Sequence, residues 1–542
     1  MFRENKNHSQ ISILESTNWM NPGIKEKLEK SWAPIFYEHV FCKIDERPFA
    51  VLYSDIGSPN FPVNIVLSLE LIKHFQDYSD DELIENFYFN YLVNYAVGNR
   101  TLGELNLAEK TLYNFRFRVY RYTLVNPDKE SLVFGQFLNL LNGFLKEAGI
   151  SAQEQRMDST LFMSNIKKAG RISLAFDVLV KAIKTIPEVL LPENLKEVLK
   201  PAFKTDTLYK TKPSESDSKL DLLLNLCAEA KYILENSLKQ EGSEALRLLN
   251  RFLREQANFD ESAKQYKAKN NKEISANSLQ SAYDEEATYR TKGKHSQSGY
   301  VLNIAETCAK GNPVQLITDY KVDQNIRSDV ELIEERLPVI KENTGCESLT
   351  TDGGYYGDDV VTAGKTDNVE LHFTDMTGRS PSEKMAVTEF EINLETRIID
   401  KCPEGYVPEA VTVTENQTVA HFPLAVCSNC KRREECHVKE QKKSYVARIN
   451  HEANTAAKQR AKIQNDRQEN ISTRAAIEGT NSALKRRERL GKLRVRGQAK
   501  CTVVVGYKII ARNFRQFCRY MIEQAKETSF SKQGAVTSLS WN

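Results

Sequence analysis

Three carboxylates stand at positions where an acid needs a chemical reason. Asp158 lies within the strand-like run 155–162, and Asp352 ends a second such run and precedes two glycines. Glu478 lies in a strongly basic segment. Three carboxylates from distant parts of a chain are what a divalent-metal phosphoryl-transfer site needs. Taken singly, each acid also fits an ordinary role, because a strand-edge Asp often caps a turn and an exposed Glu often pairs along its helix.

The segment around Glu478 has the spacing of a helix that presents one acid among cations. Arg474, Glu478, Asn481 and Lys485 are separated by four, three and four positions, so they share one helical face. From Arg474 to Arg519 the chain has thirteen Lys or Arg and two acids. Such a field attracts phosphates, although an ordinary solvated helix surface would also be basic.

Asp158 and Asp352 fit strands of an α/β sheet. Asp is disfavoured inside strands, so Asp158 in an alternating run is unusual. Asp352 falls at the carboxyl end of its run, where Gly353 and Gly354 let the backbone turn towards a helix opened by Asp358. Ligands of open α/β sheets bind at such strand ends.

The remaining core elements are expected on either side of Asp352. The runs 299–306 and 314–320 predict a hairpin, 329–343 a helix and 369–373 a strand. Residues 170–280 predict a long helical excursion.

The segment before these strands predicts a helical domain with a basic third helix. An apolar stripe follows Pro62, and Ser79 with Glu82 forms a capping box for a second helix that ends near Gly98. Asn106 and Glu109 are candidate caps for the third helix. That helix carries Arg116, Arg118 and Arg121 and suits a helix-turn-helix-like DNA contact, or else a solvated surface.

Four cysteines cluster in a segment of short β-like runs. Cys402, Cys427, Cys430 and Cys436 include a C-x-x-C pair, and four thiolates can close a tetrahedral zinc site. His421 and His437 are further candidate ligands. The alternative is reduced thiols packed in a small β unit.

Length and charge distribution limit the class of protein. The 542 residues allow several domains, and the net charge of +2 hides the basic carboxy-terminal region. No apolar run is long enough for a membrane span, and the polar start predicts a cytoplasmic protein.

These motifs resemble those of DDE transposases from bacterial insertion sequences. The resemblance rests on the Asp158 strand, Asp352-Gly-Gly-Tyr and Arg474-x3-Glu478-x6-Lys485, and it covers most of residues 60–520. Residues 61–122 are similar to the helical domain that precedes the catalytic domain in one large group of this family, and the cysteine cluster resembles an element of the same group. Ile471 stands where the family signature has tyrosine, and Gly353 stands where relatives often have alanine, which we expect to be a mild change.

The resemblance implies an α/β fold with an RNase H-like mixed sheet flanked by helices. The domains expected are an amino-terminal arm (1–30), a helical helix-turn-helix-like domain (31–135), an RNase H-like core (150–170, 295–380 and 455–525), a helical insertion (171–290), a β-rich four-cysteine insertion (381–450) and a flexible tail (526–542).

The function implied is cutting the ends of a mobile element and joining the 3′-hydroxyl ends to target DNA. Two Mg²⁺ ions, which Mn²⁺ could replace, would be held by Asp158, Asp352 and Glu478, with Asp158 bridging both. A homodimer would join two element ends in a bacterial cytoplasm, associated with the nucleoid when on DNA, and no membrane is involved. The residues expected to contact DNA are Arg474, Asn481, Lys485, Arg486, Arg487, Arg489, Arg494, Arg496, Arg116, Arg118 and Arg121.

Two alternatives share these features. A metal-dependent nuclease of the same fold would cut strands without joining them. A catalytically inactive DNA-binding protein descended from a transposase would keep the helical domain and the basic region.

Overall fold

A computed structural model of the chain describes residues 1–6, 8, 15–238, 242–292, 295–375, 384–393 and 395–538. The chain divides into two compact units. Unit 1 comprises Met1–Gln155, Ser159–Gly345 and Glu478–Asn542, and unit 2 comprises Arg156–Asp158 and Cys346–Ile477.

The amino-terminal part of unit 1 is helical, as the sequence predicts. Ser79 and Glu82 form the expected capping box, but the helix ends at Phe89 because Asn90 caps a new helix through Leu92 N. Asn106 does not cap the third helix, since its side chain accepts a hydrogen bond from Tyr88 instead. The helices are α1 (Pro22–Glu29), α2 (Trp32–His39), α3 (Val63–Gln76), α4 (Asp80–Phe89), α5 (Tyr91–Ala96), α6 (Glu109–Val125) and α7 (Leu132–Glu147).

The excursion between the first two strand groups has its own hydrophobic core, formed by buried residues between Leu174 and Ala282. The expected helices are present, but the segment ends in an antiparallel hairpin of β2 (Ala257–Asp260) and β3 (Gln265–Ala268), which the sequence did not predict. Asp260 closes the hairpin turn by accepting from Ser262 N and Ala263 N. The helices are α8 (Arg171–Ile183), α9 (Glu193–Val198), α10 (Pro201–Leu208), α11 (Ser216–Tyr232) and α12 (Glu244–Gln256).

The strands of unit 1 include the expected hairpin. Strand β5 (His295–Thr307) pairs antiparallel with β6 (Ile317–Gln324) and with β4 (Thr288–Lys292). Strand β1 (Glu154–Phe162) lies next to β5 and contributes its residues 156–158 to unit 2. Helix α13 (Asp329–Thr344) agrees with the helix expected over 329–343. It begins with a capping box at Ser328 and ends at a left-handed Gly345.

Unit 2 contains a parallel strand pair and a small β domain. Strands β7 (Ser348–Thr351) and β8 (Glu370–Phe373) are parallel and joined through α14 (Asp358–Thr366), and β1 lies next to β7. The parallel pair of unit 2 and the antiparallel strands of unit 1 make the chain a mixed α/β protein.

The small β domain of unit 2 has a core that includes Cys427 and Cys436. Its elements are β9 (Glu391–Ile392), β10 (Ile399–Lys401), β11 (Ala410–Val413), β12 (Gln417–Phe422), α15 (Leu424–Ser428), β13 (Val438–Glu440) and β14 (Tyr445–Asn450). The short β-like runs expected around the cysteines are present as strands, and β11 and β12 form an antiparallel hairpin there.

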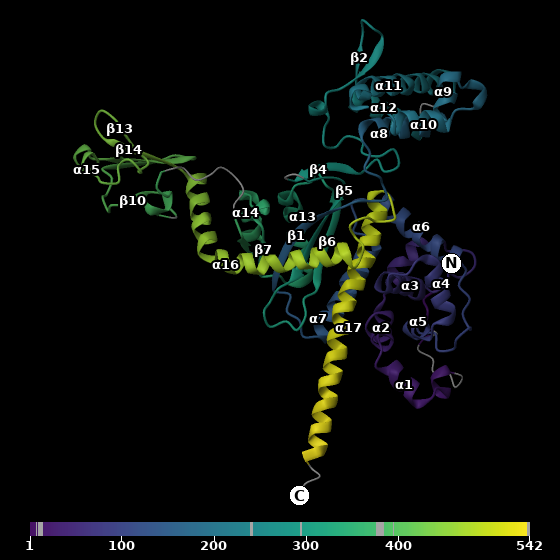
Figure 1. The fold of residues 1–542 in the computed structure, drawn as a ribbon. Coiled ribbons are helices and arrows are strands. Elements are labelled where there is room, and N and C mark those ends of the chain that lie inside the picture. Colours follow the sequence, from purple (N-terminus) through teal and green to yellow (C-terminus); the bar gives the residue numbers. More distant parts are fainter. Residues whose placement is uncertain are drawn as a thin grey trace. The chain divides into compact units, whose positions relative to one another are not determined.

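Two long helices end the chain. Helix α16 (His451–Arg486) begins in unit 2, and the division between the units falls at Glu478. Helix α17 (Gln498–Ser538) packs in unit 1 against α3, α7 and β6, beside which it runs in Figure 1. Gly506 makes that approach possible, because a Cβ there would lie 2.4 Å from the Tyr320 hydroxyl. Helical structure thus includes part of the segment 526–542, where a flexible tail was expected, and residues 539–542 lie outside the described residues.

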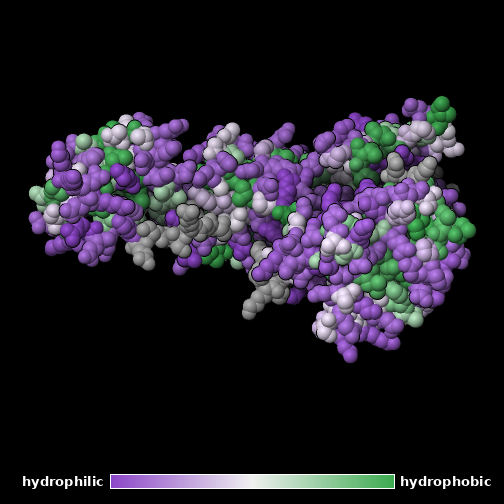
Figure 2. All heavy atoms as spheres, turned by 90° about the horizontal axis from the view of Figure 1, so that it is seen from above, coloured by the Kyte–Doolittle hydropathy of each residue, from purple (hydrophilic) through white to green (hydrophobic). Residues whose placement is uncertain are grey.

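The face drawn in Figure 2 is largely hydrophilic with separate apolar patches. Among helices in the described residues, none combines the length and apolar character needed to cross a bilayer.

Candidate functional site

Asp158 is buried in β1, with 6% of its surface exposed. Residues 155–158 are all buried, so both faces of the strand are covered around it. A carboxylate in such a position needs a hydrogen-bonding or charged partner, since burial of an isolated charge is costly.

Asp352 directly follows β7 and opens a short 3₁₀ turn over Gly353–Tyr355. Its Oδ1 accepts a 2.8 Å hydrogen bond from Gly354 N, which fixes the carboxylate at the end of the strand. Gly353 lies against the backbone of Asp375, where an added Cβ would come within 2.7 Å of the carbonyl carbon and oxygen. The expectation that alanine and glycine are nearly equivalent at this position is therefore wrong for this chain, because the backbone contact leaves no room for a methyl group.

Arg474 brings the two aspartates together in unit 2. Its Nη2 lies 3.4 Å from Oδ2 of Asp352 and 3.8 Å from Oδ1 of Asp158. Arg156, two residues before Asp158, donates a 3.0 Å hydrogen bond to the carbonyl of Thr473 and so ties β1 to the helix that carries Arg474. Two of the three predicted acids therefore share one cation.

Glu478 is exposed on α16, one helical turn after Arg474. It is the first residue of the last segment of unit 1. Its convergence with Asp158 and Asp352 stays a prediction.

The remaining residues on the signature face of α16 differ in exposure. Asn481 is buried, whereas Lys485 is exposed, as are Arg486 and Arg487. Exposed cations can reach a phosphate, so these three keep the property that a DNA contact requires.

The cations that follow α16 are partly held by the protein itself. Arg489 is exposed and pairs with Asp77 at 2.7 Å, and Arg494 is exposed. Arg496 is also exposed, but its Nε donates to the carbonyl of Asn165. These two contacts fix the positions of the Arg489 and Arg496 guanidinium groups on the surface.

Arg116 on α6 is committed to an internal ion-pair network. It contacts Glu70 at 2.7 Å and Asp80 at 2.6 Å, and Lys73 also pairs with Asp80. Burial raises the pKa of Asp80, but hydrogen bonds from Arg116 and Lys73 outweigh it and hold that pKa well below its usual range.

The other two arginines of α6 are exposed. The guanidinium of Arg118 lies over the ring of Tyr53, 4.8 Å from the ring centroid, which is a cation–π contact. Arg121 lies near the end of the same helix. DNA contact by either arginine stays a prediction.

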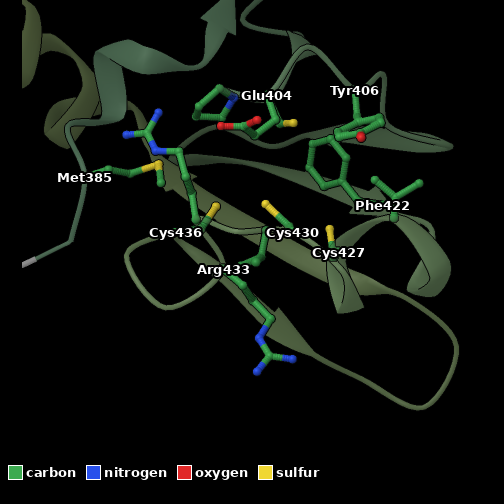
Figure 3. Close-up of a pocket in the computed structure, with 13 residues that line it drawn as sticks. Met385, Glu404, Tyr406, Phe422, Cys427, Cys430, Arg433 and Cys436 are labelled. Atoms are coloured by element: carbon green, nitrogen blue, oxygen red, sulfur yellow. The ribbon is translucent and has the colours of Figure 1, made fainter.

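The four predicted cysteines line one small cavity of about 20 Å³ in the β domain of unit 2. The sulfur atoms of Cys427, Cys430 and Cys436 point into the same space in Figure 3. Burial, followed by the neighbouring cysteines, raises the pKa of Cys427 to about 11. His437 is directed elsewhere, because its Nε2 bonds to the carbonyl of Met385. Within the described ranges, no group of three or more His, Cys, Asp or Glu side chains is already arranged to hold a metal ion.

A basic pocket in unit 1 contains functional candidates that the sequence reasoning missed. It has a volume of about 260 Å³ and lies between α3, α4, α6, the segment 489–495 and α17. Lys508 lines it and was not predicted to contact DNA, whereas Lys492 also lines it and lies in the basic run 485–500 that was expected to follow the DNA backbone. A signal for Lys508 was available, because it is the single cation in the apolar run 503–510.

Comparison with protein families gives a match in the carboxy-terminal part of the chain. Residues 401–518 match the model of a transposase DDE domain. The matched segment includes the four cysteines, Arg474, Glu478 and Lys485, whereas Asp158 and Asp352 lie before it. Neither the curated proteins nor the solved structures contain a match to the chain.

Proposed function

We propose that the chain cuts the ends of a mobile DNA element and joins them to target DNA, because residues 401–518 match the model of a transposase DDE domain. The observation that carries this proposal is the contact of Arg474 with both Asp158 and Asp352. Acids from two distant parts of the sequence meet beside the helix that bears Glu478, as a phosphoryl-transfer site would require.

The donor set fits divalent magnesium. Asp158 and Asp352 already share one cationic partner, and carboxylate oxygens are preferred Mg²⁺ ligands. Asp158, Asp352 and Glu478 would hold the ions. When bound, Mg²⁺ or Mn²⁺ would supply activation of the attacking oxygen and stabilisation of the leaving oxygen.

The chain's own residues have separate tasks in this reaction. Arg474 would bind a phosphate oxygen near the cleaved bond, and Lys485 would contact the backbone from the exposed face of the same helix. The exposed cations Arg486 and Arg487 would extend that contact. Because phosphate contacts release counterions, binding to DNA should weaken steeply as salt is raised.

We also propose a structural zinc ion in the β domain. The support is that four cysteines line one cavity large enough for a single water-sized guest. Zinc would draw Cys402, Cys427, Cys430 and Cys436 together as thiolates and would stabilise this small domain without taking part in strand cleavage.

The proposal includes a homodimer that holds two element ends in the bacterial cytoplasm. Joining two ends in one reaction requires two sets of catalytic residues, which a pair of identical chains would provide.

Asp352→Asn tests the catalytic proposal. The substitution keeps the shape of the side chain but removes the charge, so Mg²⁺-dependent cleavage of element ends should fall by on the order of 100-fold or more, while DNA binding persists. Asp359→Asn, an exposed acid in the first turn of α14, is the matched control and should cleave as the wild type does.

Three outcomes separate the possible functions. Undiminished cleavage by Asp352→Asn removes this residue from the site. Cleavage without joining of pre-cut 3′-hydroxyl ends identifies a nuclease. DNA binding with no cleavage by the wild type in Mg²⁺ or Mn²⁺ identifies an inactive descendant.

A further inference from the structure

The basic pocket of unit 1 holds more positive than negative side chains. Three acids line it, Glu70, Asp77 and Asp80. The cations that line it are Lys73, Arg116, Arg489, Lys492, Arg494 and Lys508.

Each of the three acids is already paired. Arg116 contacts Glu70 and Asp80, and Lys73 contacts Asp80. Arg489 pairs with Asp77 at 2.7 Å. These pairs hold the walls of the pocket in place and leave the charges of Lys492, Arg494 and Lys508 in excess over the acids that line it.

Lys508 supplies a buried amine to the pocket. Its Nζ donates a 2.5 Å hydrogen bond to the carbonyl of Glu488, and the residue is 8% exposed. The Glu488 carboxylate is itself buried and lies 3.4 Å from Arg515. Burying a charged amine costs free energy that an anion in the pocket would offset.

The backbone fixes the positions of Lys492 and Arg494. Leu493 N donates to the carbonyl of Met163, and Asn165 N donates to the carbonyl of Val495, so this segment is extended beside the end of β1. In an extended chain, alternate side chains share a face. Lys492 and Arg494 are accordingly exposed, whereas Leu493 between them is buried.

Other charges near the pocket do not cancel this excess. Glu82 interacts electrostatically with Arg489 and Arg494, but its carboxylate caps α4 by accepting from Ser79 N. A phosphate group offers several acceptor oxygens that point in different directions, so it suits three converging cations better than a single carboxylate does.

We propose that the basic pocket binds one backbone phosphate of DNA through Lys492, Arg494 and Lys508. The choice of DNA as the source of the phosphate rests on the proposed function. The phosphate would be held between the helical domain and the segment that follows α16, both of which belong to unit 1.

Binding of the full-length protein to a short duplex, measured over a range of salt concentrations without Mg²⁺, tests this site. Lys492→Gln and Arg494→Gln should each weaken binding about 10-fold and reduce the salt slope by about 1. Because both cations hold the same phosphate, the double variant should also lose about 1 in slope. Lys500→Gln, an exposed lysine at the start of α17 outside the pocket, is the control and should change the slope less.

The outcomes distinguish the site from its alternatives. If the double variant loses about 2 in the salt slope of DNA binding, Lys492 and Arg494 contact two different phosphates. That result would reject the proposal that both cations hold one phosphate. If Lys492→Gln and Arg494→Gln bind DNA with the same affinity and salt slope as Lys500→Gln, the proposed site is rejected. If inorganic phosphate raises the melting temperature of the wild type but not of Lys492→Gln, and both bind DNA equally, the pocket serves a free phosphate and the DNA assignment is wrong.

Failure of the catalytic proposal would be seen separately. The binding assay needs no cleavage, so it gives the same result in an Asp352→Asn background. Cleavage unaffected by Asp352→Asn together with weaker binding by Lys492→Gln would reject the catalytic site and retain the pocket.

Discussion

Nη2 of Arg474 lies 3.4 Å from Oδ2 of Asp352, and the same nitrogen lies 3.8 Å from Oδ1 of Asp158. One guanidinium therefore offsets the repulsion between two carboxylates that the proposed reaction requires to be close together. A divalent cation that binds these acids must compete with Arg474 for them.

Arg474→Gln should change the response of the protein to divalent ions. Without Mg²⁺, loss of the shared cation should lower the free energy of unfolding by about 1 kcal/mol, because the pair is only partly shielded from solvent. Added Mg²⁺ should then raise the melting temperature of the variant more than that of the wild type, since the acids are no longer neutralised. Calorimetry with and without Mg²⁺ measures both effects. Arg467→Gln, an exposed arginine on the same helix, is the control, and equal stabilisation of all three proteins by Mg²⁺ would contradict the competition.

Gly353→Ala should destabilise the turn that holds Asp352. Its Cβ would meet the Asp375 backbone at 2.7 Å, and backbone cannot move as a side-chain end can. We expect a loss of about 1–3 kcal/mol in urea unfolding, as for other overpacked sites. Gly311→Ala, where a Cβ has open space, should be close to neutral, and an equally small effect at Gly353 would show that the turn adapts.

Lys508 should make stability depend on alkaline pH. Burial, the largest cause, lowers the pKa of Lys508 to about 8 from its ordinary 10.5. The unfolded chain then keeps the Lys508 proton between these values while the folded chain has lost it, so the contribution of Lys508 to stability rises as pH increases from about 8 to 10.5. Lys508→Met should abolish this rise, which amounts to on the order of 3 kcal/mol. Urea unfolding at several pH values measures it, and a pH-independent difference between the two proteins would speak against the lowered pKa.

Zinc removal should destabilise the β domain of unit 2. If the four cysteines close on a metal, the purified protein should contain about one zinc per chain and lose it with Cys430→Ser. Chelation should lower the melting temperature of the wild type but not of that variant. Cys42→Ser, an exposed cysteine in unit 1, is the control. If the wild type contains no zinc and the chelator does not change its melting temperature, the zinc proposal is rejected and the four cysteines are reduced thiols.

Part of the candidate site could be predicted from the sequence because its residues conflict with their local surroundings. Asp158 inside a strand is unusual, whereas Asp352 before two glycines is a common pattern that became informative only together with the other acids, and the structure brings both aspartates to one arginine. The periodicity of a helix gives the face on which Arg474 lies but not the residue it contacts. The pairing of Arg116 with Glu70 was missed for the same reason, since those residues are distant in sequence.

The fold was predictable where caps and periodicity agree. Helix α13 has both a capping box at Ser328 and a terminal Gly345, and it was placed almost to the residue. The hairpin of β2 and β3 was missed because its strands are only four residues long, so each has just two apolar residues to show the alternation of a strand. Asn90 was overlooked as a cap because the apolar pattern continues on both sides of it.

The extended pairing of residues 491–495 with the end of β1 also makes this stretch intolerant of a change in length. Alternate residues face opposite ways, so inserting one amino acid before Lys492 would turn Leu493 out into water and direct cationic side chains into the protein interior. Substitutions here should be tolerated far more readily than a single-codon insertion.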